Sequence, residues 1–206
     1  MQPPSTIHDE RSTMRPLRLH ADTVQEALDR ADSRHWTRNP PRSLRARLTY
    51  LLRHHGEDRT ALAVHLGTTP AHLATLTSAP PQADNEPLYD AIETAVVRLW
   101  QPRIRRKAHH EILRNNGHVM VSVRAWLGFT AAGGSSDDPR LRMLTLGLDG
   151  PHPENLFEAR HRNEPEARLR QIFSAALGAC YFHRNRPPGV NESITIGTVD
   201  HIEFYY

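Results

Sequence analysis

The spacing of apolar residues predicts helices in the first half of the chain and strands in the second. Between Ser43 and about Ser78, apolar residues recur every three or four positions in three short segments, SLRARLTYLLRHH, DRTALAVHLG and TPAHLATLTS. This spacing places the apolar side chains along one face of a helix. We therefore expect a small helical domain over residues 42–80.

The segments on either side of this domain have weaker patterns. Residues 1–41 are expected to form a poorly ordered arm, in which only DTVQEALDRA has a short helical pattern and Pro40-Pro41 ends the segment. The stretch APPQADNEP has the composition of a linker. After it, residues 86–117 predict a long helix, which Pro102 should kink or divide because proline removes a backbone N–H and clashes with the preceding turn.

From His118 the period changes to alternation. HVMVSVRAWLGFT, LRMLTLGL and SITIGTVDHIEFYY each alternate apolar and polar residues and predict three strands. The helical segments PENLFEARH and EPEARLRQIFSAALGACYF lie between the last two. The predicted fold class is therefore α+β, with a helical DNA-binding domain followed, over residues 118–206, by a small mixed or antiparallel sheet whose helices pack on one face.

The distribution of charge changes this picture more than the net charge of +3 does. Between Arg98 and Arg124 the basic residues face only one acidic residue, Glu111. They are Arg98, Arg103, Arg105, Arg106, Lys107, Arg114 and Arg124. A solvated helix face usually mixes both signs, so this surplus predicts contact with phosphate groups. The preference for arginine over lysine is also what a biased genome composition produces.

Hydropathy and cysteine content exclude several classes of protein. The mean hydropathy is −0.61 and there is no long apolar run, so we expect no membrane span and no membrane partner. The first residues, MQPPSTIHDERSTMRP, lack the apolar core of a secretory signal, and we expect a cytoplasmic protein. Cys180 is the single cysteine; it cannot form an internal disulfide and is expected to be buried.

The second and third helical segments have the spacing of a helix-turn-helix. Ala63 falls where the two helices must approach closely, and Gly67 falls at the turn, where glycine reaches a positive φ easily. Pro70 suits the first turn of the second helix. The apolar contacts between the helices are expected from Leu62, Leu66, Leu73 and Leu76. A plain helical hairpin can have the same pattern.

The predicted recognition helix offers Thr69, His72 and Thr75 to DNA but neither arginine nor lysine. Strong direct readout of guanine is therefore not expected from it. Phosphate contacts would come from the later basic helix or from arginines of the same domain, namely Arg42, Arg45, Arg47, Arg53 and Arg59.

Other residues carry weaker predictions. Fourteen histidines include two adjacent pairs, but none has the cysteine neighbours or His/Glu spacing of a zinc site, so no metal of the protein's own is expected. Trp36, Trp100 and Trp126 could stack on unpaired bases, although packing is the commoner role of tryptophan. Trp100, beside the basic stretch, is the best candidate for base stacking and is counted with the DNA-binding residues.

Residues 124–145, RAWLGFTAAGGSSDDPRLRMLT, resemble the segment that marks the Tpg-type terminal proteins of linear Streptomyces chromosomes and plasmids. The upstream RLWQPRIRR is similar to the basic Trp-Gln-Pro stretch of that family. The region from Leu62 to Leu76 resembles its helix-turn-helix, and VDHIEFYY its acidic and aromatic tail. The resemblance covers about residues 43–206 and rests on the order and spacing of four motifs.

This resemblance implies protein-primed DNA synthesis at telomere ends, with the chain remaining as a cap on the 5′ end. The primer hydroxyl in the family is the second threonine of a Gly-Thr-Thr-Asp-Asp segment, and the matching residue here is Ser136. Ser135 and Thr130 are the alternates. The expected partners are a duplex DNA end with its single-stranded 3′ overhang, a DNA polymerase and a telomere-associated DNA-binding protein; the first nucleotide would be a cytidine nucleotide.

The residues around Ser136 suit this role. A free hydroxyl is a poor nucleophile, so the activating base and divalent metal ion must come from the polymerase, and the chain itself is expected to be no enzyme. Gly133 and Gly134 would let the backbone extend into another protein's active site, and Asp137 and Asp138 could reach the metal ions there. The same residue types are also typical of an ordinary turn or helix cap.

Two other classes of function remain open. A transcription regulator would bind duplex sites reversibly through the helix-turn-helix, as a dimer, with residues 118–206 as a ligand or dimerisation module. An enzyme acting on nucleic acid is disfavoured because the sequence has no paired carboxylates, histidine triad or metal-ligand spacing. A terminal protein should be nucleoid-associated at DNA ends and should acquire one covalent nucleotide.

Overall fold

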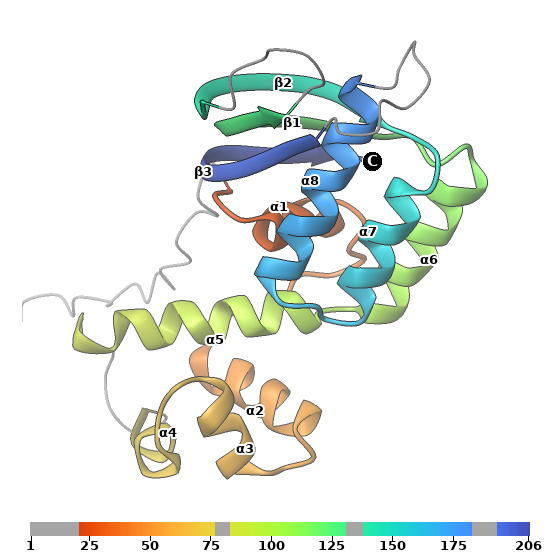
Figure 1. Cartoon of the computed structure of the whole chain (residues 1–206). Helices are drawn as coiled ribbons and strands as arrows, with labels where there is room; N and C mark the ends of the chain where they lie inside the picture. Colours follow the sequence, from red (N-terminus) through yellow and green to blue (C-terminus); the bar gives the residue numbers. More distant parts are fainter. Residues whose placement is uncertain (1–20, 77–82, 131–137, 183–192) are drawn as a thin grey trace, which may run out of the picture. The chain divides into compact units, whose positions relative to one another are not determined.

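The computed structural model describes residues 21–76, 83–130, 138–182 and 193–206 (Figure 1). The chain divides into two compact units. The helical unit contains, of the described residues, 38–100, and the sheet unit contains 21–37 and 101–206. The α+β class predicted from the sequence is confirmed.

The helical unit is built from short amphipathic helices around one apolar core. Its elements are α2 (Leu44–His54), α3 (Arg59–His65), α4 (Pro70–Leu76), the 3-10 turn η1 (Ala83–Asn85) and α5 (Glu86–Leu99). Ser43 and Asp58 begin α2 and α3 by accepting hydrogen bonds from backbone N–H groups of the first turn, which would otherwise lack partners. The core consists of Leu48, Leu51, Leu62, Ala63, Leu66, Leu73, Leu76, Ile92, Ala95 and Val96.

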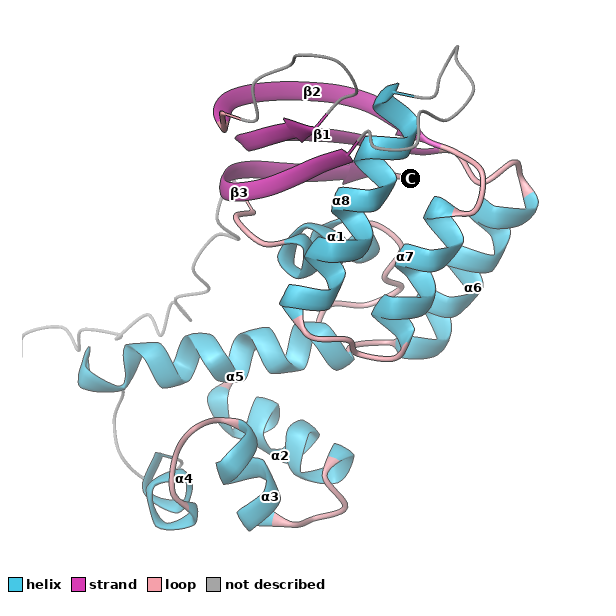
Figure 2. Ribbon diagram, in the orientation of Figure 1, coloured by secondary structure: helices cyan, strands magenta, loops and turns pink. Residues whose placement is uncertain are grey.

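The sheet unit packs helices on one face of a three-stranded antiparallel sheet of order β2-β1-β3. Its elements are α1 (Val24–Ser33), α6 (Pro102–Arg114), β1 (Val119–Thr130), β2 (Arg140–Leu148), α7 (His152–His161), α8 (Glu166–Phe182) and β3 (Ser193–Tyr205). In Figure 2, α8 runs along the sheet with α1 and α7 on the same side. The three predicted strands and the two helices between the last two are confirmed.

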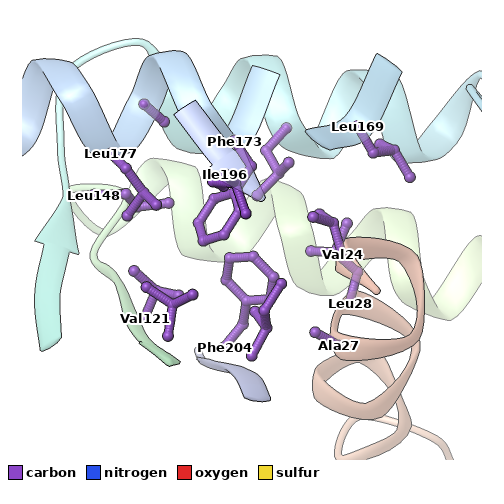
Figure 3. Packing of buried hydrophobic residues seen from close by; sticks show 14 of the residues in the cluster. Val24, Ala27, Leu28, Val121, Leu148, Leu169, Phe173, Leu177, Ile196 and Phe204 are labelled. Atoms are coloured by element: carbon purple, nitrogen blue, oxygen red, sulfur yellow. The ribbon is translucent and has the colours of Figure 1, made fainter. Parts of the chain in front are cut away.

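Alternation along β1 decides which face is covered. Val119, Val121, Val123, Ala125 and Leu127 are fully buried against the helices. Figure 3 shows Phe173 of α8 facing Phe204 of β3, and the two rings pack edge to face with centroids 5.2 Å apart. Cys180 is buried in the same cluster, as predicted.

The first 41 residues are not simply an arm. Residues 24–33 form α1, whose Val24, Ala27 and Leu28 are buried in the core of the sheet unit (Figure 3). The backbone N–H groups of Val24 and Gln25 donate to the carboxylate of Glu166 at 3.0 Å, and Ala21 forms a β-bridge with Ile202. The prediction of a poorly ordered arm is therefore wrong for residues 21–37.

The predicted long helix over 86–117 is two helices. Gln101 lies between α5 and α6 with φ 45° and ψ 53°, and Pro102 is the first residue of α6. A left-handed residue followed by proline cannot continue a helix, so α5 ends at Leu99. The two helices belong to different units, which corrects the predicted boundaries at 42–80, 86–117 and 118–206. Within the described residues, no helix is long and apolar enough to cross a membrane.

A cluster of buried charged groups lies inside the sheet unit, centred on Asp32 at the end of α1. Its carboxylate accepts hydrogen bonds from His109 Nε2 at 2.6 Å and from the Tyr206 hydroxyl at 2.8 Å. The Nε atoms of Arg105 and Arg160 lie 3.8 and 3.7 Å from Asp32 Oδ2. Buried charges are tolerated when they are paired in this way, and removing one partner leaves a charge that is costly to bury.

Two further groups of the cluster have shifted pKa values. Burial raises the pKa of Asp29 to about 6, against the opposing effect of its ion pair with Arg160. Burial, followed by the electrostatic effects of neighbouring His109, Arg105 and Arg106, lowers the pKa of His161 to about 4. The ring nitrogens His109 Nδ1 and His161 Nε2 lie 3.0 Å apart, so one of them donates to the other.

These shifts predict opposing pH effects on the free energy of unfolding. Between pH 6.5 and about 4, unfolded His161 takes up a proton that the folded ring refuses, so this residue removes stability as pH falls. Asp29 acts in the opposite sense between about pH 6 and 3.8. We expect His161→Gln to gain about 1–2 kcal/mol relative to the unchanged protein as pH falls from about 7 to 4.5, after allowance for solvent reaching this half-exposed ring.

Denaturant titration at several pH values measures this difference. His110→Gln, at an exposed histidine of α6, is the matched control. If the stability curves of His161→Gln and the unchanged protein run parallel between about pH 7 and 4.5, the proposed contribution of His161 is wrong.

Candidate nucleic-acid interface

The turn between α3 and α4 has the geometry that the sequence predicted. Gly67 has φ +66°, and its Cβ position would have no atom within 4 Å, so the backbone conformation rather than lack of space favours glycine. Ala63 is buried beneath the turn, and the Thr68 N–H donates to the Ala63 carbonyl at 2.9 Å. Pro70 begins α4. The apolar residues predicted to join the two helices are all buried: Leu62, Leu66, Leu73 and Leu76.

The exposed surface of α4 is small and uncharged. Thr69 and Thr75 are exposed; the Thr69 hydroxyl accepts from the His72 N–H at 3.2 Å, and the Thr75 hydroxyl donates to the His72 carbonyl at 2.8 Å. The methyl group and hydroxyl oxygen of each threonine can still contact a ligand, but neither side chain carries a charge. Direct readout by this helix is therefore limited to weak hydroxyl and methyl contacts.

His72 has a different role from the predicted one. Its ring is half-buried, with Nδ1 3.2 Å from the Thr68 hydroxyl and Nε2 3.1 Å from Asn85 Oδ1. A proton on Nε2, donated to the Asn85 oxygen, with Thr68 donating to Nδ1, satisfies both contacts. His72 thus links α4 to the residue that precedes α5, and its ring nitrogens are already engaged within the protein.

The five arginines of the predicted helical domain fall into two groups. Arg42, Arg45, Arg53 and Arg59 are exposed and can meet phosphate. Arg47 instead donates to the Pro41 carbonyl at 3.0 Å and pairs with Glu93 at 3.2 Å. This ion pair joins α2 to α5 and partly neutralises the charge of Arg47.

The basic residues predicted to form one stretch are separated by the fold. Arg98 lies half-buried on α5 of the helical unit, whereas the others lie on α6 or β1 of the sheet unit. Exposed cations on α6 are Arg103, Arg106, Lys107 and Arg114, and Lys107 lies 3.8 Å from Glu111. Arg103 and Lys107 are four positions apart and share one face of the helix.

Arg105 was predicted to contact DNA, and the structure corrects this. Only 6% of Arg105 is exposed, because it lies on the inward face of α6 with Ala108 and His109 and pairs with Asp32. The inward spacing of 105, 108 and 109 is readable in the sequence. An arginine and a histidine on that face do not look like core residues until their buried carboxylate partner is known.

The prediction that Trp100 stacks on bases is also corrected. It is 7% exposed, its indole N–H donates to the Arg38 carbonyl at 3.0 Å, and its ring packs against Tyr50 with centroids 5.1 Å apart. It is therefore not an exposed platform for stacked bases. Trp126 is the more accessible ring, 46% exposed on the face of the sheet opposite the helices.

Several other apolar side chains are exposed along the strands of that outer face. Met120, Leu141, Met143 and Tyr205 are each between 42% and 66% exposed. Trp126 pairs across the strands with Leu141, and the neighbouring Arg124 pairs with Met143. The β1–β3 register shifts here, and glycine at 197 avoids a tight contact, because a Cβ atom would lie 3.1 Å from the Trp126 carbonyl oxygen.

The predicted attachment segment is described only at its two ends. Thr130 is exposed as the last residue of β1, and Asp138 is exposed shortly before β2 begins at Arg140. The predicted attachment residue Ser136, its alternate Ser135, and Gly133, Gly134 and Asp137 lie outside the described residues. In the chain, this segment joins two paired strands, and Leu127–Arg140 is the pair nearest to it.

Neither a metal site nor a similar known protein identifies a function for the described residues. Among the described residues, no group of three or more histidine, cysteine, aspartate or glutamate side chains could hold a metal ion. Comparisons with protein-family models, with curated proteins and with solved structures find no match.

If the α6 cations contact DNA phosphates, their removal should change the salt dependence of binding. We expect Arg103→Gln/Lys107→Gln to reduce the slope of log K against log salt concentration by about 2, since each phosphate contact contributes about 0.9. Affinity for duplex DNA would be measured over a series of salt concentrations. Arg162→Gln/Arg168→Gln, at exposed residues of the sheet unit, makes the same change in net charge. Equal slopes for the two double variants would place the phosphate contacts elsewhere.

Proposed function

We propose that this chain is a telomere terminal protein, a DNA-binding protein whose own hydroxyl primes synthesis at the end of linear DNA. The proposal joins three features: a helix-turn-helix, exposed cations on α6, and the resemblance around residues 124–145 to Tpg-type terminal proteins. The observation that carries it is the position of the predicted attachment segment. In the chain it follows β1 and precedes β2, and the described residues of these two strands expose Trp126 and Leu141 on the outer face of the sheet.

The proposed reaction is a single nucleotidyl transfer to the protein. The Ser136 hydroxyl oxygen forms a bond to the α-phosphorus of a deoxynucleoside triphosphate, the bond from that phosphorus to the bridging oxygen breaks, and pyrophosphate leaves. The serine proton passes to a base in the polymerase. The polymerase also supplies the divalent metal ions that neutralise the charge developing on the phosphate. The chain is thus consumed as a primer and does not turn over.

The outer sheet face gives this reaction a docking surface. Exposed apolar patches rimmed by polar groups mark protein interaction sites, and large exposed residues such as tryptophan and methionine are enriched there. The charged groups along the outer face carry both signs. Near Trp126, Arg124 Nε lies 3.5 Å from Asp200, and farther along the strands Arg34 pairs with Glu203 at 2.8 Å. A mixed rim of this kind suits a protein partner better than a bare phosphate backbone. We propose that this face contacts the polymerase while the neighbouring segment enters its active site.

The priming residue can be tested by covalent labelling. The purified protein would be incubated with a host extract or polymerase, a single-stranded telomere template and a labelled deoxynucleotide, and label surviving denaturing electrophoresis would be measured. We expect the label to be lost in Ser136→Ala and retained in Ser135→Ala and Thr130→Ala, because only one hydroxyl occupies the attacking position. Loss of label in Ser135→Ala or Thr130→Ala instead would identify that residue as the attachment site and would still support the priming function.

A protein that takes up no label, in a reaction that labels an established terminal protein, would not be a primer. The helix-turn-helix would then favour a regulator, and the expected behaviour would be reversible, salt-dependent binding to a duplex site.

The docking surface predicts a separable defect. Trp126→Ala should lower the rate of labelling at least about tenfold, because a central exposed aromatic commonly supplies 2 kcal/mol or more of an interface. Affinity for DNA should be unchanged. Arg168→Ala, at an exposed residue of α8 on the helix-covered side, is the control. Normal labelling of Trp126→Ala at limiting polymerase concentration would contradict this role of the outer face.

A further inference from the structure

The helical unit contains an open hollow that the proposed function does not use. It has a volume of about 450 Å³ and is lined by Arg38, Asn39, Pro41, Tyr50, Arg53, His54 and Trp100. The lining comes from the segment before α2, from the last turns of α2 and from the residue after α5. This volume lies within the range of pockets that hold small ligands.

Aromatic rings form one part of the lining. The rings of Tyr50 and Trp100 are tilted by 60° with centroids 5.1 Å apart, and the ring of His54 lies 4.5 Å from that of Tyr50. The polar atoms of the two larger rings are directed into the protein: the indole N–H of Trp100 to the Arg38 carbonyl, and the Tyr50 hydroxyl to the Leu99 carbonyl at 2.8 Å. These bonds fix the two rings. Trp100 is almost fully buried and supports Tyr50 from behind, so the accessible ring surface of the hollow comes from half-buried Tyr50 and exposed His54.

Cationic groups form the other part. The guanidinium carbon of Arg38 lies 5.5 Å from the centroid of the Trp100 ring, and Arg53 is exposed on the last turn of α2. None of the seven lining residues is acidic. In the described part of the chain, neither Arg38 nor Arg53 forms an ion pair with a carboxylate. The hollow therefore presents two arginines whose charge is not neutralised beside two aromatic rings.

We propose that this hollow binds a single nucleotide, with the base against the accessible ring surface of Tyr50 and His54 and the phosphate held by Arg38 and Arg53. Aromatic faces stack on any base, and arginine gives bidentate hydrogen bonds to phosphate. An apolar ligand would leave the arginines unused, and a cationic ligand would be repelled by them. The shared chemistry is that of a phosphorylated base, which can be a free nucleotide or one nucleotide of a single DNA strand.

Calorimetric titration of the full chain with deoxycytidine monophosphate, deoxyadenosine monophosphate, deoxycytidine and inorganic phosphate tests this proposal. We expect saturable binding of both nucleotides and at least about tenfold weaker binding of the nucleoside and of phosphate alone, since each lacks half of the contacts. Titration with a short single-stranded oligonucleotide distinguishes the two sources. Competition with the mononucleotide at higher affinity identifies a DNA strand as the ligand, and binding of mononucleotides alone identifies a free nucleotide.

Variants locate the binding to the hollow. Arg38→Ala and Arg53→Ala should each weaken nucleotide binding at least about tenfold, whereas Arg45→Ala, an exposed arginine of α2 outside the hollow, should not. Tyr50→Phe keeps the ring and should retain binding more fully than Tyr50→Leu. Thermal unfolding of each variant checks that the unit is folded.

Absence of saturable nucleotide binding to the unchanged protein would overturn the proposal. Equal affinities for Arg38→Ala, Arg53→Ala and Arg45→Ala would overturn it as well. These readouts are reversible and need no polymerase, so failure here and failure of covalent labelling at Ser136 are distinguishable. Nucleotide binding at this hollow would stand even if the chain were not a primer.

Discussion

The carboxylate of Asp32 is the contact on which the sheet unit depends. It joins α1 to α6 through Arg105 and His109, to α7 through Arg160, and to the residue after β3 through the Tyr206 hydroxyl. Each of these groups is expensive to bury alone, and the cost is offset only when all are assembled. Burial and the Asp32 carboxylate raise the pKa of Tyr206 well above its usual value, so the hydroxyl keeps its proton and remains a donor. Assembly of the cluster therefore requires α1, α6 and α7 together.

This requirement explains the organisation of the chain. Because α1 must dock against α6, residues 21–37 belong to the sheet unit, and in the described chain the helical unit is inserted between α1 and α6. Gln101, in the left-handed region, and Pro102 then separate α5 from α6. The same constraint sorts the basic residues: Arg105 is turned inward to Asp32, while Arg103, Arg106 and Lys107 are left on the surface of α6. The basic stretch of the sequence is therefore partly structural.

The sequence predicts those features whose cause is local. The three strands follow from alternation, and the turn of the helix-turn-helix follows from glycine at 67 and buried leucines on either side. Features that depend on residues far apart in the chain cannot be predicted from local sequence patterns. Helix α1 is short and depends on Glu166 and on core contacts far along the chain, and the burial of Trp100 depends on the Arg38 carbonyl. His72 resembles a readout residue until Asn85 is seen to hold its ring. The apolar character of the outer sheet face is not predicted either. Alternation predicts that one face is exposed, but it does not predict that Trp126 and Met143 are exposed on it.

The two places where the described chain passes between the units are tied to each other. On the sheet side, the Thr37 N–H donates to Gln101 Oε1 at 3.0 Å, and Gln101 Nε2 donates to the Thr37 hydroxyl at 3.1 Å. On the helical side, the next residues are joined by the bond from the Trp100 indole to the Arg38 carbonyl. The insertion thus begins and ends at neighbouring points, which lets each unit keep its own core. Arg38 and Trp100 also line the hollow of the helical unit, so a nucleotide bound there would contact the residues through which the helical unit is joined to the rest of the chain.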